Sequence, residues 1–123
     1  MGTPAIGQRS ITPDYIPEDN QITAAPSQTT LHQSYPNPFN PEVWIPYELA
    51  TDSPISIDIY TPVGEKVRTL DIGMQSSGRY IHKDSAAYWD GRTATGERVA
   101  SGVYFYVLRT TGYVGSGKMV IVK

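Results

Sequence analysis

The sequence contains no cysteine, which excludes disulfides, thiolate nucleophiles, zinc-thiolate sites and iron-sulfur clusters. Its two histidines, His32 and His82, are isolated, and neither lies in a spacing that would bring two imidazoles onto one metal ion. Catalysis would need a nucleophile beside a base, or paired carboxylates or a histidine-carboxylate pair in a deep cleft, and no such pattern is visible. We therefore expect no catalytic residue, metal site or cofactor, and the chain is not predicted to be an enzyme.

Long apolar runs are also missing. No stretch approaches the roughly 20 apolar residues that a membrane-spanning helix needs, so membrane insertion is not expected. The N-terminus lacks the basic-then-apolar order of a signal peptide, and Met1 and Gly2 resemble an added start. If the natural protein is exported, we expect its targeting segment to lie upstream of this sequence.

Positive charge is scarce in the first half of the chain. Residues 1–61 have one basic residue against seven acidic ones, whereas residues 62–123 have nine against five, and the net charge is -2. The two halves should attract each other, although salt screens exposed pairs separated by more than about 8 Å. No cluster of cations is present that could neutralise several phosphates, so nucleic acid is not an expected partner.

The residues that are abundant favour short strands. The 123 residues suffice for one domain, and nine tyrosines outnumber the two tryptophans and two phenylalanines. All 10 prolines lie at or before Pro62, and nine of the 11 glycines follow it. This composition is typical of many short strands joined by turns rather than of long helices.

Residues 1–29 are predicted to form a disordered or loosely docked linker. They mix four prolines with serine, threonine, glutamine and scattered acidic residues, and their apolar residues follow no period. The alternative is that this segment docks on the domain surface through its few apolar side chains, namely Ile11, Tyr15, Ile16 and Ile22. We expect the globular domain to occupy residues 30–123.

Alternation of apolar and polar residues predicts the strands. The clearest is residues 55–60, where isoleucine occupies every second position. In residues 43–49 the alternation includes Pro46, which lacks an amide hydrogen and so indicates an edge or a bulge. Residues 103–108 have few polar positions, which predicts a central strand with both faces covered. Weaker candidates are residues 66–70, 79–83, 86–89 and 118–122.

Glycine-containing segments between the strands are predicted to be turns, and about seven strands with this spacing indicate a sandwich or a small barrel. Residues 90–97 have acidic ends like a calcium loop, but Arg92 stands where an oxygen ligand is needed, so a hairpin turn is favoured. Residues 112–117 lack the order of a phosphate-binding loop and are predicted to be a flexible hairpin loop.

Aromatic side chains leave a binding role open. Rings offer contact area at low entropic cost, so five residues could form a platform for a sugar or peptide: Trp44, Tyr60, Trp89, Tyr104 and Tyr106. Core packing and cross-strand pairing explain them equally well. A Lys-Asn cross-link would need a buried carboxylate that touches both groups, which sequence spacing does not reveal.

Several motifs stand in the order found in one bacterial module. They are the loop Tyr35, Pro36, Asn37, Pro38, Phe39, Asn40 and Pro41, the runs 44–49, 57–60 and 64–68, the turn Trp89, Asp90, Gly91 and Arg92, Gly96 with the run 99–106, and the closing Lys118, Met119, Val120, Ile121, Val122 and Lys123. Over residues 31–123 they resemble the C-terminal domains of type IX secretion cargo, and they are similar to the immunoglobulin-like domain of the flagellar hook-capping protein. Residues 82–88 depart from this pattern, because they form a longer link that predicts a bulge or a longer hairpin.

The resemblance implies an immunoglobulin-like antiparallel β-sandwich of about seven strands, fused to the end of a larger secreted or cell-surface bacterial protein. It implies a non-catalytic sorting or anchoring signal, read by export or surface-attachment machinery through strand edges and the closing six residues. Upstream domains of the parent protein are further expected partners. The alternative is a structural or adhesive module that binds a neighbouring domain, a protein partner or a glycan.

Two physical expectations concern the loop and the core. The three prolines of the 35–41 loop remove amide donors and stiffen it, while Asn37 and Asn40 are suited to close side-chain turns onto neighbouring amides. If Phe105 is central in the core, its truncation to alanine should cost about 3–5 kcal/mol.

Overall fold

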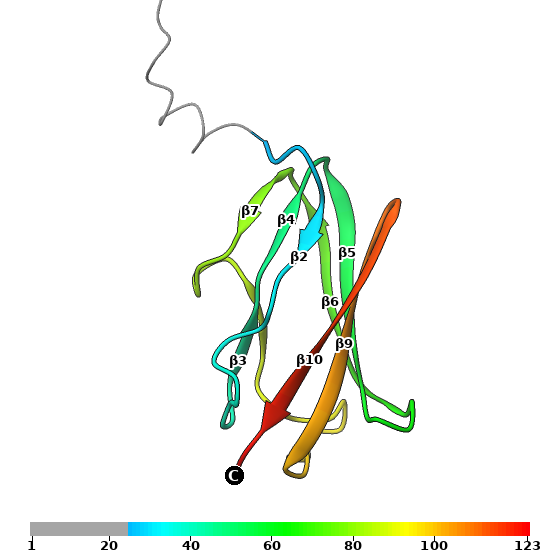
Figure 1. Ribbon diagram of the computed structural model, residues 1–123. Helices are drawn as coiled ribbons and strands as arrows, with labels where there is room; N and C mark the ends of the chain where they lie inside the picture. Colours follow the sequence, from blue (N-terminus) through cyan, green and yellow to red (C-terminus); the bar gives the residue numbers. More distant parts are fainter. Residues whose placement is uncertain (1–24) are drawn as a thin grey trace, which may run out of the picture.

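Two layers of antiparallel strands face each other in the computed structural model, which describes residues 25–123 (Figure 1). One layer is a sheet in the order β10-β9-β5-β6, and the other combines the order β2-β4-β7 with the pair β3-β8. The strands are β2 (Thr30–Leu31), β3 (Val43–Ile45), β4 (Tyr47–Leu49), β5 (Ser53–Tyr60), β6 (Lys66–Gln75), β7 (Gly78–Tyr80), β8 (Ala87–Trp89), β9 (Gly102–Thr110) and β10 (Tyr113–Ile121). Within the described residues, no helix is long and apolar enough to cross a membrane. The predicted all-β, immunoglobulin-like sandwich is confirmed.

The predicted linker, residues 1–29, lies mostly outside the described residues. The four apolar side chains on which its possible docking depended also lie outside them. The described part of this segment, residues 25–29, contacts the domain. Pro26 is buried, and the Thr29 hydroxyl accepts a hydrogen bond from the Ala50 amide at 3.0 Å. The chain therefore joins the sandwich at the β4–β5 turn, which lies at the top in Figure 1, while Lys123 lies at the bottom.

Within residues 25–123, nine strands form where about seven were predicted, because the run at residues 43–49 is divided in two and the short β2 was not predicted. Pro46 separates β3 from β4, and these two strands pair with β8 and β7. Opposite Pro46, residues 81–86 leave the sheet as an excursion. Six residues between β7 and β8 therefore correspond to the single residue Pro46 between β3 and β4. The irregularity predicted at Pro46 and the long link predicted in residues 82–88 are thus two sides of one bulge.

Alternate residues of the strands fill the space between the layers, as the sequence predicted. The isoleucines of β5 are 0–2% exposed, and the alternating residues of β3 and β4 are 0–1% exposed, namely Val43, Ile45, Tyr47 and Leu49. The fully buried side chains of largest volume are Trp89, Tyr47, Tyr106 and Phe39. Burial of this area, at about 25 cal/mol per Å², offsets the chain entropy lost on folding.

The expectation that both faces of residues 103–108 are covered is wrong. β9 does lie inside its sheet, between β10 and β5, but only Tyr104, Tyr106 and Leu108 are buried. Phe105 is 38% exposed on the outer face, which we define as the side of the four-stranded sheet turned away from the second layer. The loss of about 3–5 kcal/mol expected for a central Phe105 therefore does not apply, because that figure assumes full burial.

One carboxylate on the outer face, that of Asp58 in β5, is nearly buried among cations. Its side chain is 11% exposed, accepts hydrogen bonds from Thr69 at 2.7 Å and Arg109 at 3.2 Å, and lies 3.8 Å from the Lys66 ammonium. Burial raises the pKa of Asp58, but the hydrogen bonds from Thr69 and Arg109 and the charges of Lys66 and Arg109 outweigh it, so the pKa is lowered. These neighbours are a threonine and an arginine rather than the asparagine that a Lys-Asn cross-link requires.

The stability of the domain should depend on the ionisation of Asp58. Because its folded-state pKa is below its unfolded value of about 3.9, the stabilisation is complete above that value and is lost as pH falls through the folded value. We expect Asp58→Asn to cost about 1–3 kcal/mol at neutral pH and to match the natural protein in strong acid. Urea unfolding across this pH range measures the difference, and a constant gap between the two proteins would contradict the assignment.

Two strand predictions have the wrong bounds, and one predicted loop is mostly strand. β6 extends to Gln75 rather than residue 70, and β7 covers Gly78–Tyr80 rather than residues 79–83. The larger error concerns residues 112–117, predicted to be a flexible loop. Only Thr111 and Gly112 separate β9 from β10, and the following residues form nine consecutive pairs with β9.

Candidate functional site

Three of the segments on which the sequence resemblance rests meet at one end of the sandwich. The loop at residues 35–41, the turn at residues 89–92 and the end of β10 are distant in sequence, but contacts through Phe39 join all three. They lie toward the end opposite the β4–β5 turn, near Lys123 in Figure 1. We call this group the terminal cluster. The structure thus brings the three sets of predicted site residues together.

The 35–41 loop pairs with the outer edge of β10. The Phe39 amide donates to the Val120 carbonyl at 2.8 Å, and the Val122 amide donates to the Phe39 carbonyl at 3.0 Å. These two bonds form a parallel bridge between Phe39 and Ile121. Because β10 is the edge strand of its sheet, the bridge covers the last part of an edge that would otherwise be open.

Asn37 adds a third bond between the loop and β10. Its side-chain oxygen accepts a hydrogen bond from the Val120 amide at 3.1 Å. The sequence predicted a turn onto a neighbouring amide, but the partner lies 83 residues further along the chain. Asparagine favours local turns in most loops, so only the folded arrangement reveals this contact.

The turn at residues 89–92 is held by its own hydrogen bonds and by β6. The Asp90 carboxylate accepts bonds from the Arg92 amide at 3.0 Å and the Arg68 guanidinium at 3.1 Å. The Arg92 carbonyl accepts bonds from the Trp89 indole and from Arg68, both at 2.9 Å. The Arg92 guanidinium itself donates to the Gly96 carbonyl at 2.8 Å. Asp90 therefore acts as a turn residue, as expected for a hairpin rather than a calcium loop.

Gly91 lets the turn and the loop approach each other closely. Its φ is +77°, a backbone conformation that residues other than glycine rarely adopt. A Cβ atom at this position would lie 2.7 Å from the Pro41 carbonyl oxygen and 3.8 Å from the Ile121 side chain. The ring of Phe39 packs on Trp89 at 5.8 Å beside this contact. At Gly91 the turn therefore approaches the loop too closely to admit a side chain, and Ile121 of β10 lies beside this contact.

Only part of the terminal cluster is accessible to a partner. Its buried members are Phe39, Trp89, Gly91, Met119 and Ile121, and the half-buried ones are Tyr35, Pro41, Asp90, Arg92 and Val120. Its exposed members are Pro36, Asn37, Pro38, Asn40, Lys118, Val122 and Lys123. Of the six closing residues proposed for recognition, Lys118, Val122 and Lys123 therefore present side chains to solvent.

Tyr106 anchors the segment that leads into the loop, a role that sequence analysis missed. Its hydroxyl donates to the His32 carbonyl at 3.0 Å and accepts from the Ser34 amide at 2.9 Å. Burial raises the pKa of Tyr106, partly offset by the bonds to Ser34, so the phenol keeps its proton at neutral pH. The ring lies across from Gly117 of β10, where a side chain would collide with it. In the sequence, the glycines at alternate positions 115 and 117 were the available sign that a ring packs against this strand.

The proposed aromatic platform is not formed as a unit. Three of its members belong to the core, namely Trp89, Tyr104 and Tyr106. Trp44 is half-buried, with the Tyr35 ring stacked at 6.3 Å and the Tyr88 ring at 5.5 Å. The Lys83 ammonium lies 4.3 Å from the Trp44 ring centroid. Tyr88, 44% exposed, is the most open ring of this group, and a sugar would have to displace Lys83 to stack on Trp44.

A histidine-carboxylate pair exists, but it lies on the outside of the second layer. The His32 Nε2 atom is 2.6 Å from a Glu48 oxygen, with side chains 39% and 22% exposed, and Arg79 approaches the other Glu48 oxygen at 3.3 Å. Within residues 25–123, no group of three or more histidine, aspartate or glutamate residues could hold a metal ion. The terminal cluster instead combines backbone pairing at Phe39 with the exposed side chains of Lys118, Val122 and Lys123.

Comparison with known proteins shows a shared fold. No protein-family model matches this chain, and no curated protein matches its sequence. The crystal structure of dimeric latent PorU from Porphyromonas gingivalis is similar, with 19% identity and a TM-score of 0.54, over 76% of this chain and 9% of that one. PorZ, a surface component of the type IX secretion system of the same bacterium, matches with 21% identity and a TM-score of 0.49, over 76% of this chain and 11% of that one. This chain thus spans about a tenth of either structure, and the likeness to PorU is one of fold.

Proposed function

We propose that this chain is a non-catalytic module of a larger secreted or cell-surface bacterial protein. In this proposal it is a sorting and anchoring signal for export across the outer membrane and attachment to the cell surface. Its partners are the export or surface-attachment machinery and the upstream domains of the parent protein. Neither catalysis nor nucleic-acid binding nor membrane insertion is part of this role.

The proposal rests on the arrangement of the terminal cluster. Two segments that contribute to the resemblance to type IX secretion cargo, the 35–41 loop and the 89–92 turn, surround the end of β10, and the loop fixes that end by backbone pairing at Phe39. The cluster also lies away from the β4–β5 turn, where the chain joins the domain (Figure 1). A receptor could therefore reach Lys118, Val122 and Lys123 while an upstream domain occupies the other end.

An export assay tests this role. The full chain is fused behind a signal peptide and a reporter, in a bacterium with a type IX secretion system, and reporter at the cell surface is measured. We expect deletion of residues 118–123 to abolish surface delivery. The deletion also removes the buried Met119 and Ile121, so a second variant, Val122→Asp with Lys123→Glu, changes only exposed side chains. It should lower delivery by about tenfold or more, because reversed charge at a recognised end opposes binding.

The control for this assay is Lys83→Glu, a charge reversal on the 81–86 excursion of the other layer. The Val122→Asp, Lys123→Glu variant should keep the melting temperature of the natural domain. Lys83→Glu loses the contact with the Trp44 ring, about 0.5–1 kcal/mol, but should stay folded and be delivered normally. Unchanged delivery after deletion of residues 118–123, or in the folded double variant, would exclude recognition through this end of the chain.

The second candidate is a structural or adhesive module that holds a neighbouring domain, a protein partner or a glycan. The exposure of Tyr88 beside Trp44, and of Phe105 on the outer face, favours it. The two candidates differ in the same assay, because a purely adhesive module would not deliver the reporter to the surface even with its natural sequence.

A further inference from the structure

Part of the β10 edge is open beyond the Phe39 bridge. The Val120 amide donates to the Asn37 side chain and the Val120 carbonyl accepts from the Phe39 amide, so both groups point away from β9. In an antiparallel pair, residues that bond to the neighbouring strand alternate with residues whose amide and carbonyl point outward. β10 pairs with β9 at nine consecutive residues, without a register shift. The amides and carbonyls at positions 114, 116 and 118 therefore also point outward.

Most of these outward groups have no partner within residues 25–123. The Lys118 carbonyl accepts a hydrogen bond from the Gln33 side-chain amide at 3.0 Å. In that described part of the chain, the Lys118 amide and the amides and carbonyls of Ser116 and Val114 have no bonding partner. Both Ser116 and Val114 are exposed. An exposed edge of this kind is a template for a further strand.

Both ends of this stretch are closed, and we call residues 114–118 the open edge. At one end, the 35–41 loop occupies the edge at Val120. At the other end, Thr111 and Gly112 form the turn that follows β9, so β10 starts only at Tyr113. Ser116 is therefore the centre of the open edge.

The opposite edge of the same sheet, β6, is less regular. Its register with β5 shifts between Ile55 and Ser56, and Gly73 at this shift has a φ of +87°. Such bulges bend a strand and disrupt pairing with a further strand. The Val67 carbonyl of β6 also accepts a hydrogen bond from the Ala94 amide at 3.2 Å. The open edge of β10 is thus the better template in this sheet.

We propose that two copies of this chain pair through their open edges, antiparallel and about a two-fold axis at Ser116. In this register Ser116 lies opposite the partner's Ser116, and Val114 lies opposite the partner's Lys118. Each outward amide then meets a carbonyl of the other copy, and the Lys118 carbonyl has a second lone pair beside the one that Gln33 uses. A two-fold pairing is closed, so it forms a dimer and no longer chain of copies. The inference does not depend on the proposed export role.

The two closed ends select this register. An axis one residue nearer the chain end would bring Val114 opposite the partner's Val120, whose amide and carbonyl are already bonded to the 35–41 loop. An axis one residue nearer the turn would bring Lys118 opposite the partner's Gly112, which precedes the start of β10. Either shift leaves outward groups without partners, whereas the axis at Ser116 pairs all of them.

The charges on the outer face are compatible with this dimer. Like charges directly opposite one another destabilise strand pairing, but here Lys118 faces an uncharged Val114. The nearest cation in that row is Arg109, which lies opposite Val114 on β9. It would be two strand spacings, about 10 Å, from the partner's Lys118, where salt screens exposed charges.

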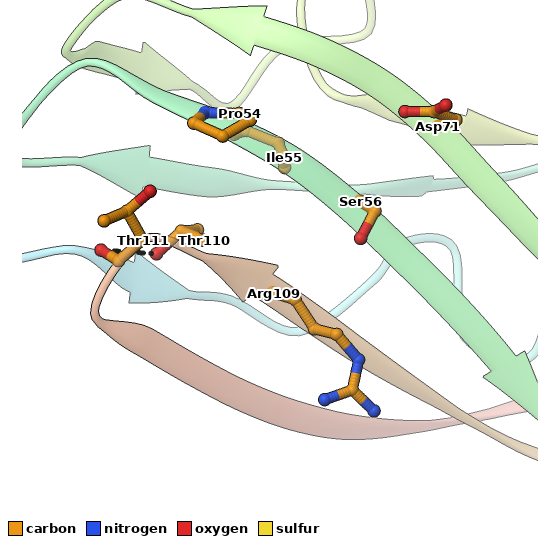
Figure 2. Close-up of a pocket in the computed structure, with 7 residues that line it drawn as sticks. All are labelled: Pro54, Ile55, Ser56, Asp71, Arg109, Thr110 and Thr111. Carbon is orange, nitrogen blue, oxygen red and sulfur yellow. Dashed lines mark hydrogen bonds between the residues drawn. The ribbon is translucent and has the colours of Figure 1, made fainter.

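The charge of Arg109 is also balanced by a carboxylate. Its guanidinium donates to Asp58 of β5 at 3.2 Å. Figure 2 shows Arg109 in one row with Ser56 on β5 and Asp71 on β6, around a shallow hollow of the outer face. This row places a second carboxylate on the outer face. We therefore expect little repulsion between the two copies.

The dimer should be weak. Pairing over residues 114–118 buries far less than the roughly 1,200 Å² of a stable interface. We expect a dissociation constant of about 0.1–1 mM, so the dimer forms where copies are concentrated.

Disulfide formation tests the register in the full chain. The natural sequence has no cysteine, so each variant has a single thiol. Ser116→Cys should form covalent dimers on oxidation, because opposite Cα atoms in such a pair lie about 5.5 Å apart, within reach of a disulfide. Val114→Cys alone is the control and should couple about tenfold more slowly, because the two thiols would lie roughly 14 Å apart along the strands. Val114→Cys mixed with Lys118→Cys should couple as readily as Ser116→Cys.

NMR spectroscopy of the natural chain tests the pairing without a cross-link. Between about 0.05 and 1 mM, concentration-dependent amide shifts should centre on Val114, Ser116 and Lys118. Ser116→Pro removes an outward amide and no bond to β9, so it should abolish the shifts at Val114 and Lys118 and keep the melting temperature. Ser116→Ala keeps that amide and should keep the shifts.

Two results would overturn the proposal. One is coupling of Ser116→Cys no faster than that of Val114→Cys, and the other is an absence of amide shifts up to about 1 mM. Shifts centred instead on Val103 and Phe105 would assign self-association to the outer face and overturn it as well.

Discussion

Gly91→Ala is expected to lower the free energy of unfolding by about 3 kcal/mol or more, and the melting temperature by roughly 10–20 °C. Two costs add together. A residue with a side chain at φ +77° loses about 1–2 kcal/mol, because its Cβ crowds the backbone in this conformation. The new Cβ would also lie 2.7 Å from the Pro41 carbonyl oxygen, a backbone atom that moves only if the loop moves. The loop-to-turn contact in the terminal cluster would open.

Gly96→Ala is the matched control for this prediction. Gly96 lies in the same hairpin with φ +93°, but a Cβ there would meet no atom within 4 Å. It should therefore show only the backbone cost of about 1–2 kcal/mol. Denaturant unfolding of both variants measures the difference. Equal losses would show that the approach of Pro41 to Gly91 does not contribute to stability.

Gly117→Ala should be about as severe for a different reason. A Cβ on Gly117 would lie 2.3 Å from the ring of Tyr106, which is 1% exposed and whose hydroxyl bonds to Ser34 and His32. The ring can move only by breaking both bonds and leaving the buried space. We expect a loss of about 3 kcal/mol, made up of overpacking and two unsatisfied buried groups.

A double-mutant cycle isolates this contact. Tyr106→Leu removes the ring and costs stability alone, but it frees the space that a Cβ at position 117 needs. In the Tyr106→Leu background, Gly117→Ala should therefore cost at least about 1 kcal/mol less than in the natural protein. Additive losses in thermal unfolding would place the strain of Gly117→Ala elsewhere. Ser116→Ala, on the exposed side of the same strand, should be nearly neutral.

The period-two pattern predicted the fold because burial in a two-layer sandwich follows it directly. The isoleucines of β5 and the apolar residues around Pro46 face the core, as their alternation indicated. Alternation fails where both sides of a strand are apolar. In β9, Phe105 is as apolar as Tyr104 and Tyr106, and nothing in the sequence states that only one side is covered.

The glycines of β10 led to the wrong prediction of a loop for a related reason. Gly115 and Gly117 resemble loop residues by composition, yet they are strand residues whose missing side chains admit the rings of Tyr113 and Tyr106. A glycine that makes room for a distant ring has the same local signature as one that makes a turn.

The candidate site was predictable as a set of segments but not as a contact. The order of the motifs identified the 35–41 loop, the 89–92 turn and the closing residues, and the structure places them together. The bonds that join them connect residues more than 80 positions apart, as between Asn37 and Val120. Local preferences contain no information about such partners, so Asn37 was expected to bond a neighbour.

The opposite positions of Lys123 and the β4–β5 turn have a mechanical consequence (Figure 1). If the domain is tethered at Lys123 and pulled through the preceding chain, the force runs along the strands. Hydrogen bonds between antiparallel strands lie perpendicular to that direction, so the nine pairs of β9 with β10 would share the load in shear instead of separating one after another. The bonds of Phe39 to Val120 and Val122 would brace the loaded strand on its other side.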